Sequence, residues 1–117
     1  MAKSSTLRIP FNKIKKVILG ANYKLSLAFS TKAVATKLHK KYKKKNGPAN
    51  ILSFPYSKNN GEILIHLNSI RDEASKFGHT YSEHLLFIYI HGLLHLKGYK
   101  HGAIMEKQEN KYFKKFS

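Results

Sequence analysis

The sequence contains no cysteine, which excludes a disulfide framework and any thiolate ligand for a metal ion. Acidic residues are also scarce: six stand against 22 lysines and arginines, which gives a net charge of +16 with neutral histidines. No run approaches the roughly eighteen consecutive apolar residues that a membrane-spanning helix needs. The first eleven residues lack the apolar core of a signal peptide, so we expect a cytoplasmic protein with no membrane partner.

Lysine accounts for most of the charge, because 20 of the 22 basic residues are lysine. A positive field of this size attracts polyanions and raises their encounter rate, and nucleic acid is the commonest polyanion. The alternative is a solvated, lysine-rich surface without a specific partner. The charge favours contact with nucleic acid.

The chain has 117 residues, of which 42% are hydrophobic, so we expect a single domain over residues 1–117 with a compact core. Apolar periodicity and turn residues predict an α+β fold in which helices pack on a small mixed sheet of three or four strands. The expected helices are 10–20, about 31–45, 68–77, 82–97 and 103–116, and the expected strands are 23–29, 51–54 and 62–67.

Local patterns set the expected faces and ends of these elements. Pro55 should stop the second strand, and Asn60-Gly61 should form the turn of a hairpin. Ser82 should cap the longest helix, and Gly98 should end it. Ser30 or Thr31 should cap the helix that follows the first strand. The positions expected to be buried in the first three elements are Phe11, Ile14, Val17 and Ile18, then Tyr23, Leu25, Leu27 and Phe29, then Val34, Leu38 and Tyr42.

Residues 91–101 read HGLLHLKGYKH and hold three of the seven histidines. Residues four apart lie on one face of a helix, so His91 and His95 project in the same direction. Gly98 permits a positive φ angle that turns the chain back, which brings His101 within reach of the same ion. Three imidazoles leave one position of a tetrahedral zinc ion open, as in catalytic zinc sites.

Nitrogen ligands favour one zinc ion, although copper, nickel or iron would also suit them. The alternative is that these histidines only form hydrogen bonds with the backbone of a core helix. His84 is a weaker candidate for a fourth ligand, because two helical turns, about 10 Å, separate it from His91. The other three, His39, His66 and His79, are expected at the surface or at strand ends.

The spacing HxxxHxxGxxH also occurs in metzincin proteases. Those enzymes carry a glutamate as general base directly after the first histidine, and Gly92 stands at that position here. Glycine cannot accept a proton, so a protease function is disfavoured. Hydrolysis would need help from elsewhere, for example from a phosphate of the substrate.

The histidine segment HGLLHLKGYKH closely resembles the HGxLHLxGYDH signature of the YbeY family of bacterial endoribonucleases. Residues 49–55, ANILSFP, resemble the family's TNVLSFP, and residues 61–65, GEILI, resemble its GDIVI. Residues 105–109, MEKQE, are similar to the MExxE of its last helix. These matches occur in the family's order between about residues 38 and 109.

The resemblance implies a mixed α+β fold with one zinc-like ion held by His91, His95 and His101. It also implies cleavage directed at single-stranded RNA, late trimming of small-subunit ribosomal RNA at its 3′ end, and a role in ribosome quality control. The implied partners are ribosomal RNA and the small ribosomal subunit.

The chain departs from the family at two charged positions. Lys43 stands where the family has an arginine that faces the active cleft, and Lys100 replaces the signature aspartate. Lysine can hold a phosphate as a point charge but lacks the two-pronged geometry of arginine. Lys43 is therefore a candidate catalytic contact to phosphate, with a solvated helix-end lysine as the alternative.

Residues 37–45, KLHKKYKKK, predict a basic wall along which an RNA backbone could run. Helical spacing places Tyr42 in the core rather than on the surface as a stacking platform for bases. The candidate RNA-binding lysines are Lys37, Lys40, Lys41, Lys44, Lys45 and Lys100.

A second class of function stays open at this point. The chain could be a non-catalytic factor of ribosome assembly that binds RNA and whose metal ion only braces the fold. Gly92 and the two lysine substitutions favour this alternative. Cleavage of single-stranded RNA, compared between the wild type and His91→Ala, separates the two.

Overall fold

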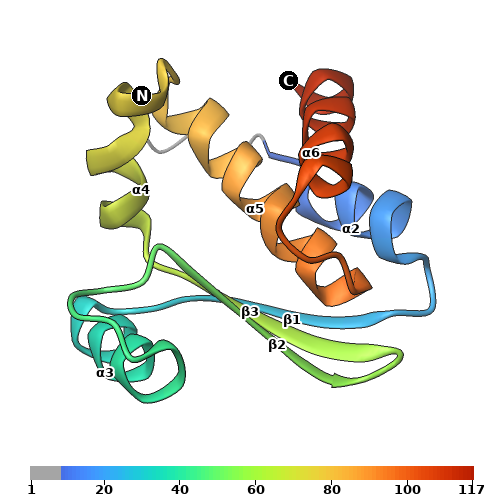
Figure 1. Cartoon of the computed structure of the whole chain (residues 1–117). Helices are drawn as coiled ribbons and strands as arrows, with labels where there is room; N and C mark the ends of the chain where they lie inside the picture. Colours follow the sequence, from blue (N-terminus) through green and yellow to red (C-terminus); the bar gives the residue numbers. More distant parts are fainter. Residues whose placement is uncertain (1–8) are drawn as a thin grey trace.

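The computed structural model describes residues 9–117, and the N-terminal segment in which a signal peptide would begin lies outside this range. Figure 1 shows an α+β fold, as expected. The elements in chain order are α2 (Phe11–Leu19), β1 (Lys24–Phe29), α3 (Lys32–Lys43), β2 (Ile51–Ser57), β3 (Asn60–Ile65), α4 (Leu67–Ala74), the single 3-10 turn η1 (Ser75–Phe77), α5 (Tyr81–Lys97) and α6 (Ala103–Phe116).

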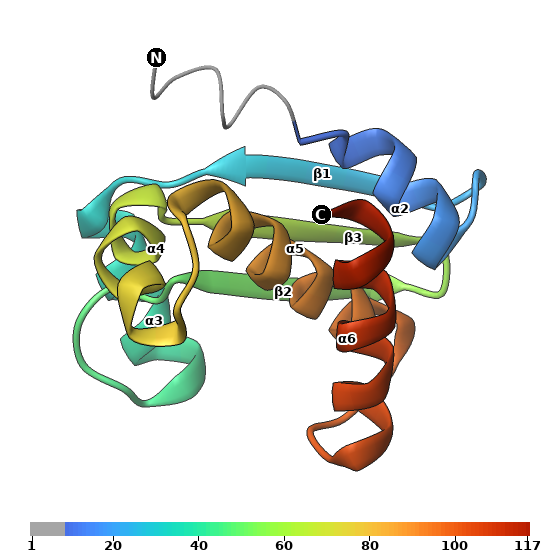
Figure 2. The same ribbon diagram turned by 90° about the horizontal axis from the view of Figure 1, so that it is seen from above.

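The sheet has three strands in the order β1-β3-β2. The central strand β3 pairs in parallel with β1 and antiparallel with β2, so the expected hairpin and the mixed sheet are both present. Helices α2, α4, α5 and α6 lie on one side of the sheet, while α3 lies at one end of the other side (Figures 1 and 2). We call these two sides the inner face and the outer face.

The core lies between the inner face and α5. Ile63 and Ile65 of β3 are fully buried, as are Leu85, Ile90 and Leu93 of α5. Helix α5 is apolar on most of its circumference because α2, α4, α6 and the sheet cover it from several directions. No helix among residues 9–117 combines the length and the apolar character that crossing a bilayer requires.

The hairpin differs from the prediction in its turn and in the length of its first strand. Lys58 and Asn59 form the turn, and Asn60 and Gly61 already belong to β3. Strand β2 continues through Pro55 to Ser57, with an irregularity in register between these two residues. Proline is tolerated there because β2 is an edge strand, where the missing N–H costs no ladder bond.

All three of the predicted apolar faces were partly wrong. Val17 of α2 and Phe29 of β1 are exposed, although the other positions expected on those faces are buried or half-buried. In α3 the buried residue is Ala35, whereas Val34 and Tyr42 are exposed. The reason is that α3 covers only one end of the outer face, so most of its surface faces solvent (Figure 1).

The helix ends follow local chemistry closely. Thr31 caps α3, because its hydroxyl accepts a hydrogen bond from the backbone N–H of Val34. The cap of α5 is Thr80 rather than Ser82, and it forms a reciprocal capping box with Glu83. Gly98 ends α5 with a φ of 111°, as predicted.

Candidate metal centre

The three clustered histidines lie where α5 ends and the chain turns toward α6. One ligand nitrogen of each residue, His91, His95 and His101, lies within 4.8 Å of the other two. The bend at Gly98 makes this possible: its N–H donates to the carbonyl of His95, and the N–H of Tyr99 donates to that of Leu94. These paired bonds reverse the chain and return His101 to the end of the helix.

Two of these histidine rings are oriented by hydrogen bonds that their Nδ1 atoms make. The Nδ1 of His91 contacts the carboxylate of Glu109, and the Nδ1 of His95 lies 3.1 Å from the carbonyl oxygen of Tyr99. Neither partner can donate a proton, so each Nδ1 carries the hydrogen and donates it. Each Nε2 is then a lone pair, and the two Nε2 atoms face each other at 3.0 Å.

This donor set fits a transition-metal ion. Two imidazole lone pairs at 3.0 Å repel each other unless a cation or a shared proton lies between them. Histidines that donate their other N–H to a carboxylate or a carbonyl are the usual arrangement at metal centres. The described residues add no cysteine or carboxylate ligand to the group, so nitrogen donors alone define it.

Burial and neighbouring charge also prepare His95 to act as a neutral ligand. Its pKa is lowered, first by burial and then by the positive charge that His91 would carry. The hydrogen bond to the carbonyl of Tyr99 opposes this shift, while His101 and Lys43 add to it. The lowered pKa of His95 favours the neutral ring, which is the form that binds a metal ion.

Glu109 was not identified as a site residue from the sequence. It lies on α6, is only 7% exposed, and approaches His91 across 18 residues of chain. A signal was present: MEKQE places Met105 and Glu109 four apart on the buried face of a helix that is otherwise rich in lysine. A buried acid in a chain with six acidic residues marks a position where a carboxylate has a partner.

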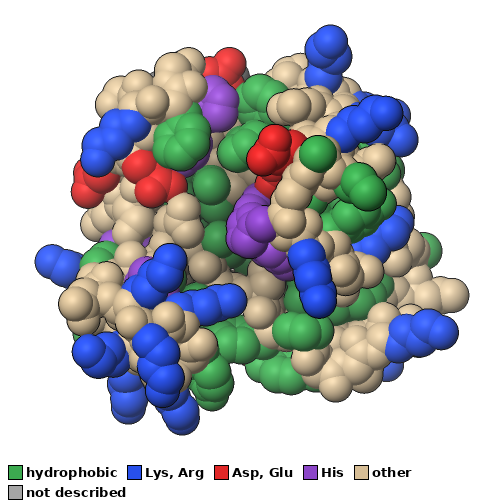
Figure 3. Space-filling model, viewed as in Figure 1, with side chains coloured by type: hydrophobic (Ala, Val, Ile, Leu, Met, Phe, Trp, Pro, Cys, Tyr) green, Lys and Arg blue, Asp and Glu red, His purple; other side chains and the backbone are tan. Residues whose placement is uncertain are grey.

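The histidines open into a cleft of about 720 Å³. Figure 3 shows histidine side chains near the middle of this side of the molecule, with acidic side chains and lysines around them. The walls come from β2, the end of α3, the α4–η1 segment, and helices α5 and α6. The cleft is open to solvent, and its volume is large enough to take more than a single small ion.

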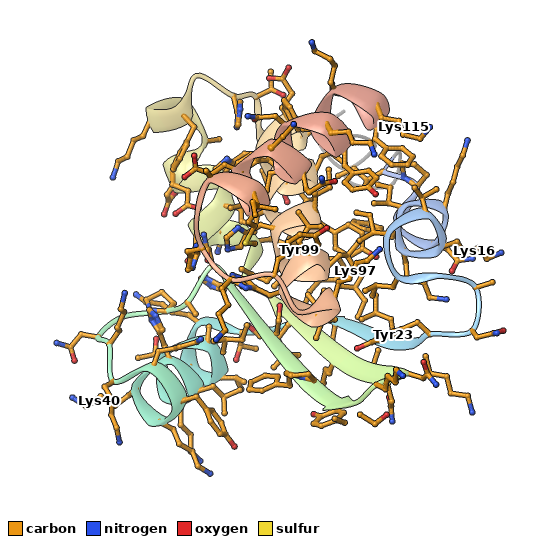
Figure 4. All side chains as sticks on the ribbon, turned by 45° about the vertical axis from the view of Figure 1, so that its right-hand side comes forward. Lys16, Tyr23, Lys40, Lys97, Tyr99 and Lys115 are labelled. Carbon is orange, nitrogen blue, oxygen red and sulfur yellow. The ribbon has the colours of Figure 1, made fainter. Side chains whose placement is uncertain are left out.

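Two of the seven predicted lysines line this cleft. Lys43 and Lys45, at the end of α3, lie in its wall, and Lys43 is close enough to lower the pKa of His95. Lys40 points away from the fold at the outer end of α3 (Figure 4) and approaches the amide oxygen of Asn46 at 3.4 Å. The other four are exposed and lie outside the cleft wall: Lys37, Lys41, Lys44 and Lys100.

Position 92 has no room for a catalytic glutamate. Gly92 faces the sheet, and a Cβ atom there would approach the Cδ1 of Ile51 at 2.5 Å and the Oγ of Ser53 at 3.1 Å. The hydroxyl of Ser53 donates to the carbonyl of Gly92 at 3.2 Å, which holds α5 close to β2. A side chain at this position would therefore require Ile51 and the facing part of β2 to move.

His84 is not a fourth ligand of this group. It is fully buried, its Nε2 lies 2.9 Å from the carboxylate of Glu73, and its Nδ1 lies 3.1 Å from the Nδ1 of His79. His79 stacks against Phe77 and is half-buried, so it is not a plain surface residue. The remaining two histidines also have hydrogen-bond partners. His66 is buried at the start of α4 and pairs with Ser69, and His39 pairs with the carbonyl of Gly47.

The family model and the curated relatives that match this chain all belong to one protein family. The model of the family described as Endoribonuclease YbeY matches residues 5–117. The chain is 35% identical over 88 residues to an Ehrlichia chaffeensis protein named endoribonuclease YbeY, covering 71% of this chain and 57% of that protein. It is 36% identical over 94 residues to the Petrotoga mobilis protein of the same name, covering 74% of this chain and 65% of the other.

The match thus covers less than two thirds of the length of these curated relatives. Among solved structures, the solution structure of a Thermotoga maritima protein superposes with a TM-score of 0.67 at 22% identity. That superposition covers 97% of this chain and 82% of the other, and it establishes similarity of fold.

Proposed function

The chain belongs to the YbeY endoribonuclease family, and from that premise we propose that it is a metal-dependent endoribonuclease that cuts single-stranded RNA. We propose small-subunit ribosomal RNA as the substrate, with 3′-end maturation and ribosome quality control as the processes served. The small ribosomal subunit is then the partner and the cytoplasm the compartment. We propose His91, His95 and His101 as the ligands of one zinc or similar ion.

The observation that carries this proposal is the pair of Nε2 lone pairs of His91 and His95 that face each other at 3.0 Å at the wall of a cleft that Lys43 and Lys45 also line. The carboxylate of Glu109 and the carbonyl of Tyr99 hold these rings in the tautomer that a ligand needs. His101 is exposed after the bend and supplies the third nitrogen.

The proposed reaction needs a metal ion, positive charge at the phosphate and a proton acceptor. When bound, the ion supplies a Lewis acid for a phosphoryl oxygen and lowers the pKa of water. The ammonium groups of Lys43 and Lys45 at the cleft wall offset negative charge on the phosphate as it reacts. Because position 92 carries no carboxylate, the proton acceptor must be another group of the cleft or a phosphate oxygen of the substrate.

The lack of a carboxylate at position 92 supports a second candidate function. In this candidate the chain is a non-catalytic RNA-binding assembly factor, and the ion only stabilises the turn after α5. Cleavage requires a proton acceptor, and the position that supplies it in metzincins is closed here. In this second candidate the chain binds RNA through the same cleft but does not cleave it.

One assay separates the two candidates. The protein is incubated with a single-stranded RNA of about 20 nucleotides and Zn²⁺, and the wild type is compared with His91→Ala and with Lys16→Ala. Lys16 lies on α2, away from the cleft, and serves as the control for a surface substitution (Figure 4). The nuclease predicts products from the wild type and Lys16→Ala but not from His91→Ala. Equal product in all three, or none in any, would favour the binding factor.

A further inference from the structure

Most of the outer face of the sheet is left uncovered, because α3 lies beneath only one end of it (Figure 1). The register places Phe54 of β2 opposite Glu62 of β3, and Glu62 opposite Ser26 of β1. These side chains alternate with the buried ones and so point to the outer face. Tyr56 lies on the same face, since its hydroxyl donates to the carboxylate of Glu62 at 2.6 Å.

Three aromatic rings gather on this face, and we call Tyr42, Phe54 and Tyr56 the aromatic platform. Tyr42 comes from the end of α3, and its ring meets Phe54 edge-on with centroids 5.3 Å apart. Tyr42 is 53% exposed and Tyr56 is 62% exposed. Exposed aromatic rings clustered on a sheet are costly to leave in water and indicate a surface that stacks against another flat group.

The charge around the platform is positive. The Nζ of Lys41 lies 5.3 Å from the centroid of the Tyr42 ring. Lys24 is paired with Asn60 on the outer face, and Lys58 lies in the adjacent hairpin turn. Glu62 is the one acidic residue that the strands place on this face within residues 9–117, and it accepts the hydroxyl of Tyr56.

The platform is continuous with the cleft. Strand β2 is an edge strand: its residues Ile51 and Ser53 line the cleft on the inner side, and Phe54 and Tyr56 point to the outer side. Pro55, between the two rings, also lines the cleft. A chain molecule that leaves the histidine site over this edge therefore reaches the platform next.

We propose that the aromatic platform is a second RNA-binding surface, on which bases of the substrate strand stack after the strand crosses the edge of β2. Lysines at its border contact the phosphates, while the rings contact base faces without reading sequence. This proposal rests on the proposed function for the nature of the substrate. A second copy of the chain is a poor occupant, because two such positively charged borders would repel each other.

The test measures binding, without cleavage, of a fluorescein-labelled 12-nucleotide poly-U and of an abasic strand of the same length, with EDTA present. Base stacking contributes about 1–3 kcal/mol per base by alanine substitution, so Tyr56→Ala should weaken poly-U binding roughly 5- to 150-fold. Tyr56→Phe keeps the ring and should bind within about twofold of the wild type. For the wild type, the abasic strand should bind at least as weakly as poly-U binds to Tyr56→Ala, because two rings of the platform remain in that variant.

Lysines give a matched control for charge. Lys58→Ala should weaken both strands equally, and Lys16→Ala, on α2 at the inner side of the sheet, should change neither beyond about twofold (Figure 4). Glu62→Gln removes the acidic charge of the face and should tighten binding of both strands. Circular dichroism and sedimentation confirm that each variant folds and stays in the wild-type state of association.

Two results would contradict the proposal that the aromatic platform binds RNA. One is equal poly-U affinity for the wild type and Tyr56→Ala, and the other is equal affinity of the wild type for poly-U and the abasic strand. A dimer that Tyr56→Ala dissociates would assign the face to self-association instead. Failure of the nuclease proposal is a separate outcome, since it requires intact binding to the platform without any cleavage by the wild type.

Discussion

The carboxylate of Glu109 on α6 contacts the Nδ1 of His91 on α5, so the last helix sets the orientation of a side chain on the helix before it. The buried carboxylate fixes the proton of His91 on Nδ1 and turns Nε2 toward His95. Helix α6 is therefore part of the candidate metal centre, although it supplies none of the three nitrogens.

Glu109→Gln should weaken zinc binding about 10- to 100-fold, because the loss of an outer-shell partner of a metal-bound histidine has that effect. The measurement is a competitive zinc titration against a chromophoric chelator. Glu106→Gln is the matched control, since Glu106 lies one turn earlier on α6 and is exposed. Equal weakening by both substitutions would mean that general charge, and not the contact to His91, matters.

Gly92→Glu should not create a protease and should destabilise the fold by roughly 3 kcal/mol or more. The side chain would be placed between α5 and β2, where even a Cβ meets Ile51 and Ser53, so the helix and the strand would have to move apart. Urea unfolding gives the free energy. Gly92→Ala is the comparison, and its cost should be smaller because only a methyl group is added. A wild-type unfolding midpoint for Gly92→Glu would contradict the packing described.

Gly61→Ala should destabilise the protein by about 1–3 kcal/mol. A Cβ at this position would collide with the hydroxyl of Tyr23 and approach the carbonyl of Phe54 at 3.1 Å. The hydroxyl of Tyr23 is buried and lacks a hydrogen-bond partner among the described residues, so Tyr23→Phe alone should be neutral or stabilising. The double variant should recover part of the loss. Strict additivity in a urea double-mutant cycle would disprove the contact.

The stability of the metal-free protein should fall as the pH drops below about 6.5. Because the pKa of His95 is lower in the folded chain than its ordinary value, the unfolded chain binds more protons in this range, and stability rises with pH. Urea midpoints at pH 7.5 and pH 5.5 in EDTA give the difference for the wild type. That difference should be smaller for His95→Gln, which cannot titrate. An equal difference in both proteins would remove His95 as the cause.

The sequence predicted those parts of the fold that depend on local chemistry. The three histidines, the turn at Gly98 and the cap at Thr31 each depend on residues within a few positions of one another, and the structure brings the histidines together as the spacing predicts. The α+β class also followed from local patterns, because apolar periodicity and turn residues mark the strands and most of the helices.

The features that the sequence did not predict depend on contacts between residues that are far apart in the chain. Glu109 and His91 are 18 residues apart, and only the packing of α6 on α5 brings them together. Tyr42 was expected in the core because its helical spacing is apolar, yet whether that stripe is buried depends on how much of the sheet α3 covers. The reason for glycine at position 92 likewise appears only once α5 is placed against β2.

Metal content of the purified protein tests the central claim most directly. After reconstitution with zinc and removal of excess ion, elemental analysis should find about one ion per wild-type chain and much less in His91→Ala, His95→Ala and His101→Ala. His39→Ala, whose histidine pairs with the carbonyl of Gly47, should keep the wild-type content. One ion per chain in all four variants would show that the three histidines do not hold it.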